Sequence, residues 1–273
     1  MTTRRHHGGE MSIAEDLLAV EEPLEIRIGE RPISVTMRTP GHDDALVAGF
    51  LVSESIVAER QAIASIRHWG SANTVRVTLR EGATVDFQRL QRHFYSTSSC
   101  GICGKTSIDA LRVHARPLQS ALRLDAGTLS AMPAALRRAQ PTFDATGGLH
   151  AAALFSADGR LLSLHEDIGR HNAVDKVIGE QFLEGRLPLS EHVLFVSGRT
   201  SFEIVQKAVM AGIPIVAAIS APSSLAVRLA REFNVTLAGF VREERFNVYA
   251  GEERIRAPLI ASARARSGRD PAG

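Results

Sequence analysis

Cysteine is scarce in this chain, which has only two among its 273 residues. Two cysteines cannot build the network of disulfides that stabilises small secreted domains, so a disulfide framework is excluded. The pair stands close together, as Cys100-Gly-Ile-Cys103. In a reducing compartment this spacing is typical of metal binding or of thiol chemistry, and not of a structural disulfide.

Aromatic residues and an excess of one charge are also lacking. Phe, Trp and Tyr make up 5% of the chain, so an extended surface on which nucleic-acid bases stack is not expected. The 32 basic residues nearly balance the 30 acidic ones, which argues against a broad basic face for duplex binding. We therefore predict no nucleic-acid partner, and any site for an anion must be local.

Long hydrophobic runs are absent as well. The longest uncharged apolar run, at 208–219, is interrupted by Gly212 and Pro214 and is shorter than the ~20 residues that span a bilayer. Near the N-terminus, Glu10 and Glu15 interrupt the place where a signal peptide would be apolar. We expect no membrane segment and a cytoplasmic location.

What the chain does contain is an ordinary globular composition with 44% hydrophobic residues, which is enough for a sizeable core. Residues 1–12 are predicted to be a flexible N-terminus, and residues 13–125 a small α+β unit that ends with the CxxC loop. Residues 126–260 are predicted to form an α/β domain. Residues 261–273 have no periodicity and are predicted to be a flexible tail.

The α/β prediction rests on strands and helices that alternate along the second unit. A hairpin is expected around Ala157-Asp-Gly159, because the flanking segments alternate around this turn. Thr200 and Glu203 match a capping box at the start of a helix. The other expected elements are a helix at 172–183, strands at 192–196 and 215–219, a helix at 223–233, and a strand pair at 236–240 and 246–249. Ligands of such sheets bind at the carboxyl ends of the strands.

Two predicted junctions between a strand and a helix carry a glycine followed by an arginine. Arg170 follows Gly169 and precedes His171, whereas Arg199 follows Gly198. Helix N-termini and guanidinium groups both favour anions, so the two junctions together predict a site for a phosphate-bearing ligand. A solvated, charged loop is the alternative interpretation of the first junction.

The segment around the cysteines is rich in glycine. Gly101 and Gly104 leave the sulfur accessible, and Lys105 favours the thiolate, which indicates a nucleophilic or sulfur-carrying thiol. A zinc site is the alternative, although a lone CxxC supplies only two of the four ligands that a closed site needs.

His150 stands at the start of a predicted strand, after two glycines. A zinc deaminase would have a glutamate two residues after this histidine, followed later by Pro-Cys-x-x-Cys. Here Ala152 occupies that position and the CxxC comes earlier in the chain, so hydrolytic deamination is disfavoured. A hydrogen-bonded core histidine is an equally good interpretation of His150.

Together these motifs resemble the FdhD family of formate dehydrogenase accessory proteins, which are sulfur carriers. The resemblance extends from about Glu21 to Tyr249, and the chain departs from the family pattern at Ser55, where glycine is usual. The segments that carry the resemblance are Ser98-Ser-Cys-Gly-Ile-Cys-Gly-Lys105, Thr146-Gly-Gly-Leu-His-Ala-Ala-Ala153, Glu166-Asp-Ile-Gly-Arg-His-Asn172, Ser197-Gly-Arg199, Ala211-Gly-Ile-Pro214, Ser220-Ala-Pro-Ser-Ser-Leu225 and Thr236-Leu-Ala-Gly-Phe240.

The resemblance implies a cytidine-deaminase-like, three-layer α/β/α sheet domain with a smaller α+β unit. It also implies a sulfurtransferase that takes persulfide sulfur from a cysteine desulfurase and passes it to the bis(molybdopterin guanine dinucleotide) molybdenum cofactor, for the catalytic subunit of formate dehydrogenase. Cys100 would bear the persulfide, and Cys103 would relay or resolve it. A homodimer is expected on the same ground. The alternative is a chaperone that holds the cofactor without covalent sulfur transfer, its CxxC binding a structural metal.

The cofactor site implied by the resemblance falls on a segment that the residues alone would describe as a charged turn. Fragments of the cofactor that resemble GDP are expected to bind there, because their phosphates need cationic contacts. The implied residues are Phe240, Val241, Arg242, Glu243, Glu244 and Arg245, and the anion argument adds Arg170, His171, Gly198 and Arg199.

Overall fold

A computed structural model describes residues 1–83, 85, 112 and 115–257 of the chain. The larger unit is built on a six-stranded mixed sheet with the order β13-β12-β11-β10-β8-β9. Its strands are β8 (His150–Ser156), β9 (Leu161–Asp167), β10 (His192–Val196), β11 (Ile215–Ala218), β12 (Thr236–Gly239) and β13 (Asn247–Ala250). The three central strands β10, β11 and β12 are parallel, and the other three each pair antiparallel with a neighbour.

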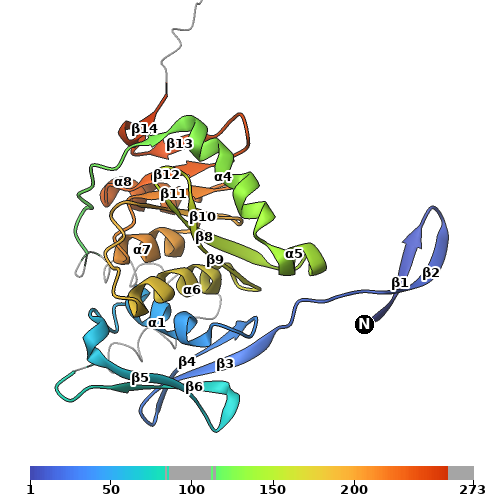
Figure 1. Cartoon of the computed structure of the whole chain (residues 1–273), viewed down its shortest axis with the longest axis horizontal. Helices are drawn as coiled ribbons and strands as arrows, with labels where there is room; N and C mark the ends of the chain where they lie inside the picture. Colours follow the sequence, from blue (N-terminus) through green and yellow to red (C-terminus); the bar gives the residue numbers. More distant parts are fainter. Residues whose placement is uncertain (84, 86–111, 113–114, 258–273) are drawn as a thin grey trace, which may run out of the picture.

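Helices cover both faces of this sheet (Figure 1). On one face lie α6 (Arg170–Leu183), α7 (Phe202–Met210) and α8 (Ser224–Glu232). On the other face lies α4 (Ala126–Arg138), which is followed by the short helix α5 (Pro141–Thr146). Because side chains alternate across a strand, β8, β10, β11 and β12 each contribute to two hydrophobic clusters, one under each helical layer. This arrangement confirms a mixed α/β fold, whereas the likeness to cytidine deaminases stays a prediction.

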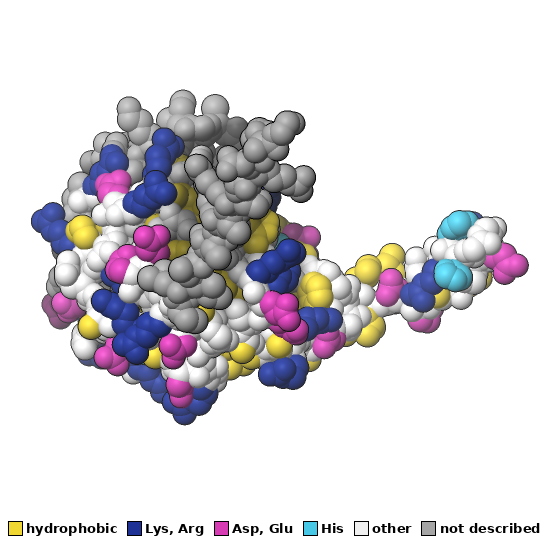
Figure 2. Space-filling model, turned by 90° about the horizontal axis from the view of Figure 1, so that it is seen from above, with side chains coloured by type: hydrophobic (Ala, Val, Ile, Leu, Met, Phe, Trp, Pro, Cys, Tyr) yellow, Lys and Arg dark blue, Asp and Glu magenta, His cyan; other side chains and the backbone are white. Residues whose placement is uncertain are grey.

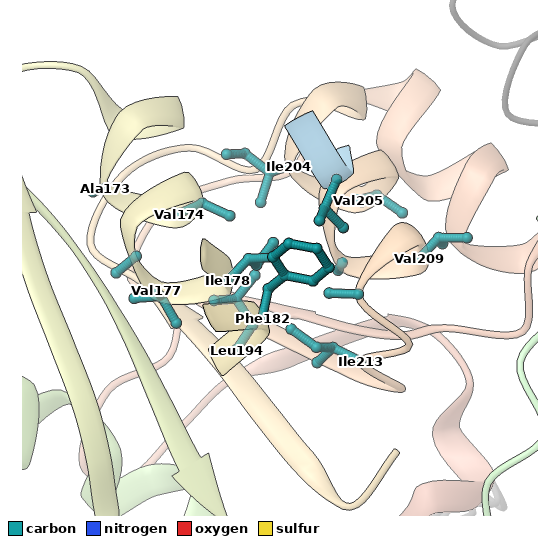
Figure 3. Packing of buried hydrophobic residues seen from close by; sticks show 14 of the residues in the cluster. Ala173, Val174, Val177, Ile178, Phe182, Leu194, Ile204, Val205, Val209 and Ile213 are labelled. Carbon is teal, nitrogen blue, oxygen red and sulfur yellow. The ribbon is translucent and has the colours of Figure 1, made fainter. Parts of the chain in front are cut away.

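Apolar side chains fill the space between α6, α7 and the sheet. The ring of Phe182 lies among Ile178, Val205, Val209 and Ile213 (Figure 3). All five side chains are buried. Burial of this kind stabilises by roughly 1.5–3 kcal/mol for each large side chain, so this layer fixes the helices on which the candidate site stands.

The smaller unit is a four-stranded sheet packed on one helix. Its strands, in the order β4-β3-β6-β5, are β3 (Glu22–Ile28), β4 (Arg31–Arg38), β5 (Ile63–Trp69) and β6 (Ser71–Leu79). Helix α1 (Asp43–Ser53) lies between this sheet and α6 (Figure 1). Ser55, where the resembled family usually has glycine, adopts a positive φ of 58° just after α1.

Short elements complete the described chain. A two-stranded parallel pair joins β7 (Leu124–Asp125) to β14 (Ile255–Arg256). Single 3-10 turns occupy Arg60–Ala62 and Glu252–Arg254. No helix in the described residues is long and apolar enough to cross a membrane.

The N-terminus differs from the flexible end predicted for residues 1–12. Strands β1 (Thr2–His7) and β2 (Glu10–Glu15) pair antiparallel and form a hairpin that projects from the body of the molecule (Figures 1 and 2). Gly8 and Gly9 both have positive φ, which suits the tight two-residue turn of a hairpin. Residues 1–15 contribute to neither hydrophobic cluster, so their sequence carries no apolar pattern from which the hairpin could be predicted.

The boundary predicted at residue 125 also differs from the structure. The segment that precedes β7 lies along the larger unit: Leu118 donates its N–H to Phe233 O at 2.9 Å and accepts from Asn234 Nδ2 at 2.8 Å. Ser120 Oγ donates to Ser190 O at 2.8 Å. The described residues 115–125 therefore contact the α/β domain, and the domain boundary itself stays a prediction. The predicted tail at 261–273 lies outside the described residues.

Candidate functional site

At one edge of the main sheet the chain enters β8 and β13 and leaves β9, β10, β11 and β12. His150 begins β8 and pairs with Asp167, which ends β9, and Val196 at the end of β10 pairs with both Ala152 and Ala218. The segments that follow β9, β10, β11 and β12 are therefore neighbours, as the strand pattern predicted. Along this edge lie Arg170 and His171, then Gly198 and Arg199, then Ser220 to Pro222, then Phe240 to Arg245.

Backbone hydrogen bonds tie three of these segments together. Thr200 donates its N–H to Ala221 O at 3.1 Å and accepts from the N–H of Ser223 at 2.9 Å. The N–H of Phe240 donates to Ser220 O at 3.2 Å. The capping box predicted at Thr200 is wrong, because α7 begins after Ser201 and the Thr200 hydroxyl has no hydrogen-bond partner in the described structure. Its backbone instead joins the loops after β10 and β11.

Gly198 packs closely against two side chains of the candidate site. A Cβ built on Gly198 would stand 3.3 Å from Nδ1 of His150 and 3.7 Å from Cδ of Arg170. Burial lowers the pKa of His150, and the nearby charges of Arg170 and Arg199 lower it further. Arg170 and Arg199 therefore both lie near His150, whose imidazole is neutral at pH 7.

His171 is a second neutral imidazole in this cluster. Its Nε2 lies 3.2 Å from Ser201 Oγ and 3.8 Å from Glu203 Oε2. Burial lowers the pKa of His171 to about 4, with further lowering by Lys207 and Arg170. At neutral pH the ring is uncharged, so it can donate one hydrogen bond and accept another.

Asp167 holds the turn that presents Arg170 and His171. Its side chain is fully buried and accepts hydrogen bonds from the N–H of Gly169 at 2.8 Å and from Asn172 Nδ2 at 3.0 Å. Lys176 Nζ lies 2.7 Å from its other oxygen. In the motif Glu-Asp-Ile-Gly-Arg-His-Asn, the aspartate and asparagine thus position the loop, and the arginine and histidine face the candidate site.

Two guanidinium groups of the cluster are available to an anion. Arg199 is exposed and has no hydrogen-bond or ion-pair partner among the described residues. Nε of Arg170 is buried and also lacks a partner in the described structure. A buried unpaired donor costs about 1–3 kcal/mol, so a ligand that accepts from Arg170 would recover that loss.

The segment after β12 forms the turn predicted from its residues. The N–H of Arg242 donates to Arg245 O at 2.8 Å, and Arg242 Nη1 donates to Ile219 O at 2.7 Å. Val241 is fully buried in the core, so only its backbone can meet a ligand. Phe240 is 44% exposed with a positive φ of 54°, and Glu243, Glu244 and Arg245 are exposed.

The remaining candidate residues are the two cysteines and His150. Cys100 and Cys103 lie outside the described residues. His150, for which the sequence left a core role open, lies in the candidate site; its place at the start of a strand, beside glycines, was the available signal. Among the described residues, no group of three or more His, Cys, Asp or Glu side chains is arranged to hold a metal ion.

Comparisons with known proteins agree with this picture. Residues 19–256 match the FdhD/NarQ family. Proteins named sulfur carrier protein FdhD are 52% identical in Streptomyces avermitilis (92% of this chain, 93% of that protein) and 44% identical in Sulfolobus acidocaldarius (90% and 94%). A crystal structure from Desulfotalea psychrophila, of a protein proposed to be a formate dehydrogenase accessory protein, is similar with a TM-score of 0.75 at 26% identity, covering 94% of this chain and 98% of that one. The chain belongs to the FdhD/NarQ family.

Proposed function

We propose that this protein is a sulfur carrier that receives persulfide sulfur on Cys100 and passes it to the bis(molybdopterin guanine dinucleotide) molybdenum cofactor. The names of relatives at about half identity over nine-tenths of the chain support the sulfur-carrier role. The donor is a cysteine desulfurase, the recipient of the cofactor is the catalytic subunit of a formate dehydrogenase, and the working form is a homodimer.

The observation that carries the proposal is the convergence of arginine-bearing segments on one sheet edge. Arg170 and Arg199 both lie near His150, and the turn that ends at Arg245 lies further along the same edge. The cofactor has two nucleotide arms, each with phosphates, and guanidinium groups bind phosphate through paired, charge-assisted hydrogen bonds. Because the phosphates of the two arms lie apart, an edge with several separate arginines suits this elongated anion better than one phosphate pocket would.

The sulfur chemistry balances with the two cysteines alone. The Cys100 thiolate attacks the outer sulfur of the donor persulfide; the donor S–S bond breaks, and the desulfurase cysteine leaves as a thiolate. Release follows when the Cys103 thiolate attacks the inner sulfur of the Cys100 persulfide. A Cys100–Cys103 disulfide forms, and the outer sulfur leaves as hydrosulfide, which the cofactor accepts. The two thiols supply the electrons for this release, and cellular thiols then reduce the disulfide.

The chain's own residues have distinct tasks in this proposal. Arg170, Arg199 and Arg245 bind and orient the phosphates of the cofactor. His150 and His171 stay neutral at pH 7, so they offer hydrogen bonds without adding charge. Asp167 holds the turn before α6 in place and so keeps Arg170 on the binding edge.

We call the sheet edge that carries Arg170, Arg199 and Arg245 the cofactor face. Binding to this face is tested by calorimetry with GDP as the probe. GDP should bind, and its affinity should fall as salt rises, because the contacts to its phosphates are charged. Arg245→Ala should weaken binding by roughly 1.5–3 kcal/mol, the value of a hydrogen bond to a charged group. Arg228→Ala, which removes an exposed arginine on α8, is the matched control and should change nothing. Absence of binding at about millimolar GDP would contradict the cofactor face.

A second candidate function is a chaperone that binds the cofactor without covalent sulfur transfer, its CxxC holding a structural metal. The two proposals differ in one measurable respect, since only a carrier thiol gains sulfur from a desulfurase.

A further inference from the structure

A pocket of about 960 Å³ lies between α4 and the turn that follows β12. The pocket opens on the side of the sheet that is opposite α6 and α7. Among the long helices in the described part of the chain, α4 is the one that covers this side. Its lining residues are Pro133, Ala134, Arg137 and Arg138 from α4, Ile219 after β11, and Val241, Arg242, Glu243, Glu244 and Arg245 after β12. The residues implied by the family resemblance include the wall after β12 but no residue of α4.

Two of the four arginines in this pocket are already engaged. Arg137 forms an ion pair with Asp144 and stacks over the ring of Phe143 at 4.9 Å. Arg242 donates to the carbonyl oxygens of Ile219 at 2.7 Å and Val241 at 2.8 Å. These contacts fix the two side chains as parts of the pocket wall.

The other two arginines have no such partner. Within the described part of the chain, neither Arg138 nor Arg245 has a side-chain hydrogen bond or an ion pair, and both are exposed. They come from opposite walls, one from the last turn of α4 and one from the turn after β12. Between them, Pro133 and Ile219 contribute apolar surface. A pocket that combines some apolar surface with two unpaired guanidinium groups suits a ligand that has a flat ring and a diphosphate.

We propose that Arg138 of α4 is a phosphate-binding residue of this pocket and that it acts together with Arg245 on the diphosphate of one nucleotide arm of the cofactor. The proposal rests on the proposed function and adds to it the wall formed by α4. An arginine in the last turn of a helix also complements the helix dipole. That role does not require the side chain to line a pocket, and it predicts no effect on nucleotide affinity.

The test is a GDP titration of four proteins: wild type, Arg138→Ala, Arg138→Lys and the control Arg228→Ala. Arg138→Ala should weaken GDP binding about tenfold or more, because one charged contact to phosphate is lost. Arg138→Lys should recover part of the affinity, since it keeps the charge but lacks the planar fork. Arg228→Ala should bind GDP like the wild type. Thermal unfolding of each variant shows whether the fold is intact.

A second readout uses the wild-type protein alone, so it does not depend on a variant that folds. GDP should slow backbone hydrogen exchange in residues 134–138 as well as in residues 242–245. Protection confined to the second segment would overturn the proposal.

The outcomes separate this inference from the proposed function. If the wild type binds GDP and Arg138→Ala binds it as tightly as Arg228→Ala does, the role of Arg138 is refuted and the cofactor face stands. If the wild type does not bind GDP, both the pocket and the cofactor face are refuted. Persulfide formation on Cys100 is measured independently and decides the sulfur-carrier role in either case.

Discussion

Gly179 of α6 lies directly against the backbone of α1: a Cβ built on Gly179 would stand 1.8 Å from the carbonyl oxygen of Ala45. Gly49 of α1 makes the reciprocal approach, with its Cβ position 1.9 Å from Asp175 O. No side chain fits at either position without a shift of backbone. This contact joins the small sheet unit to the helical layer that carries the candidate site.

The first prediction follows from this close approach. Gly179→Ala should destabilise the protein by about 3 kcal/mol, because the added methyl group overlaps a backbone atom that cannot move aside. Chemical denaturation of the two proteins measures the difference in the free energy of unfolding.

Gly127→Ala is the matched control for this substitution. Gly127 also lies in a helix, α4, but nothing stands within 4 Å of its Cβ position. Alanine there should be neutral or stabilise by up to about 1 kcal/mol, through its higher helix propensity. Equal effects of the two substitutions would show that α1 and α6 are not in close contact.

The second prediction concerns the buried ion pair between Asp175 of α6 and Lys207 of α7. Lys207 Nζ lies 2.9 Å from both oxygens of Asp175, and both side chains are buried. Lys207→Met should cost about 3–5 kcal/mol, because it leaves a buried carboxylate without its partner. The double variant with Asp175→Asn should be more stable than Lys207→Met alone, since it removes that charge. If the double variant is less stable than Lys207→Met, the unpaired carboxylate of Asp175 does not explain the loss of stability.

The third prediction concerns the pH dependence of His171. Its pKa is lowered to about 4 in the folded protein, against 6.5 in the unfolded chain. Between these values the unfolded chain binds a proton that the folded protein does not bind. The contribution of His171 therefore makes folding less favourable as pH falls from about 6.5 to about 4, and it is constant above that window.

NMR measures this pKa directly from the ring resonances of His171, which are assigned by their loss in His171→Gln. The midpoint should lie near 4. A midpoint near 6.5 would contradict the burial of the ring beside Arg170 and Lys207, and with it the neutral state that the proposed site requires.

Much of the main sheet was predictable because its signals are local. The β8–β9 hairpin follows from alternation around Asp158-Gly159, and the apolar runs of β10 and β11 are typical of strands buried on both faces. Strands β9 and β10 run in the same direction on either side of β8, so their carboxyl ends lie at the same edge of the sheet and the proximity of Arg170 and Arg199 was predictable as well.

Other features depend on contacts between distant segments. Strand β5 has little sequence signal, because Ile63–Trp69 does not alternate strictly; it is placed by its pairing with β6. The capping box at Thr200 was predicted from spacing alone, whereas the backbone of that residue is held by the loop at Ala221 and Ser223. The wall that α4 contributes to the pocket had no sequence signal, since arginines at a helix end are common for electrostatic reasons.

The central claim is that Cys100 carries sulfur, and intact-protein mass spectrometry tests it most directly. The protein is incubated with a cysteine desulfurase and cysteine, and wild type, Cys100→Ala and Cys103→Ala are compared. Wild type and Cys103→Ala should each gain about 32 Da, the mass of one sulfur atom, which reducing agent removes. Cys100→Ala should gain nothing. An adduct that persists in Cys100→Ala, or that is absent from both the wild type and Cys103→Ala, would contradict the account.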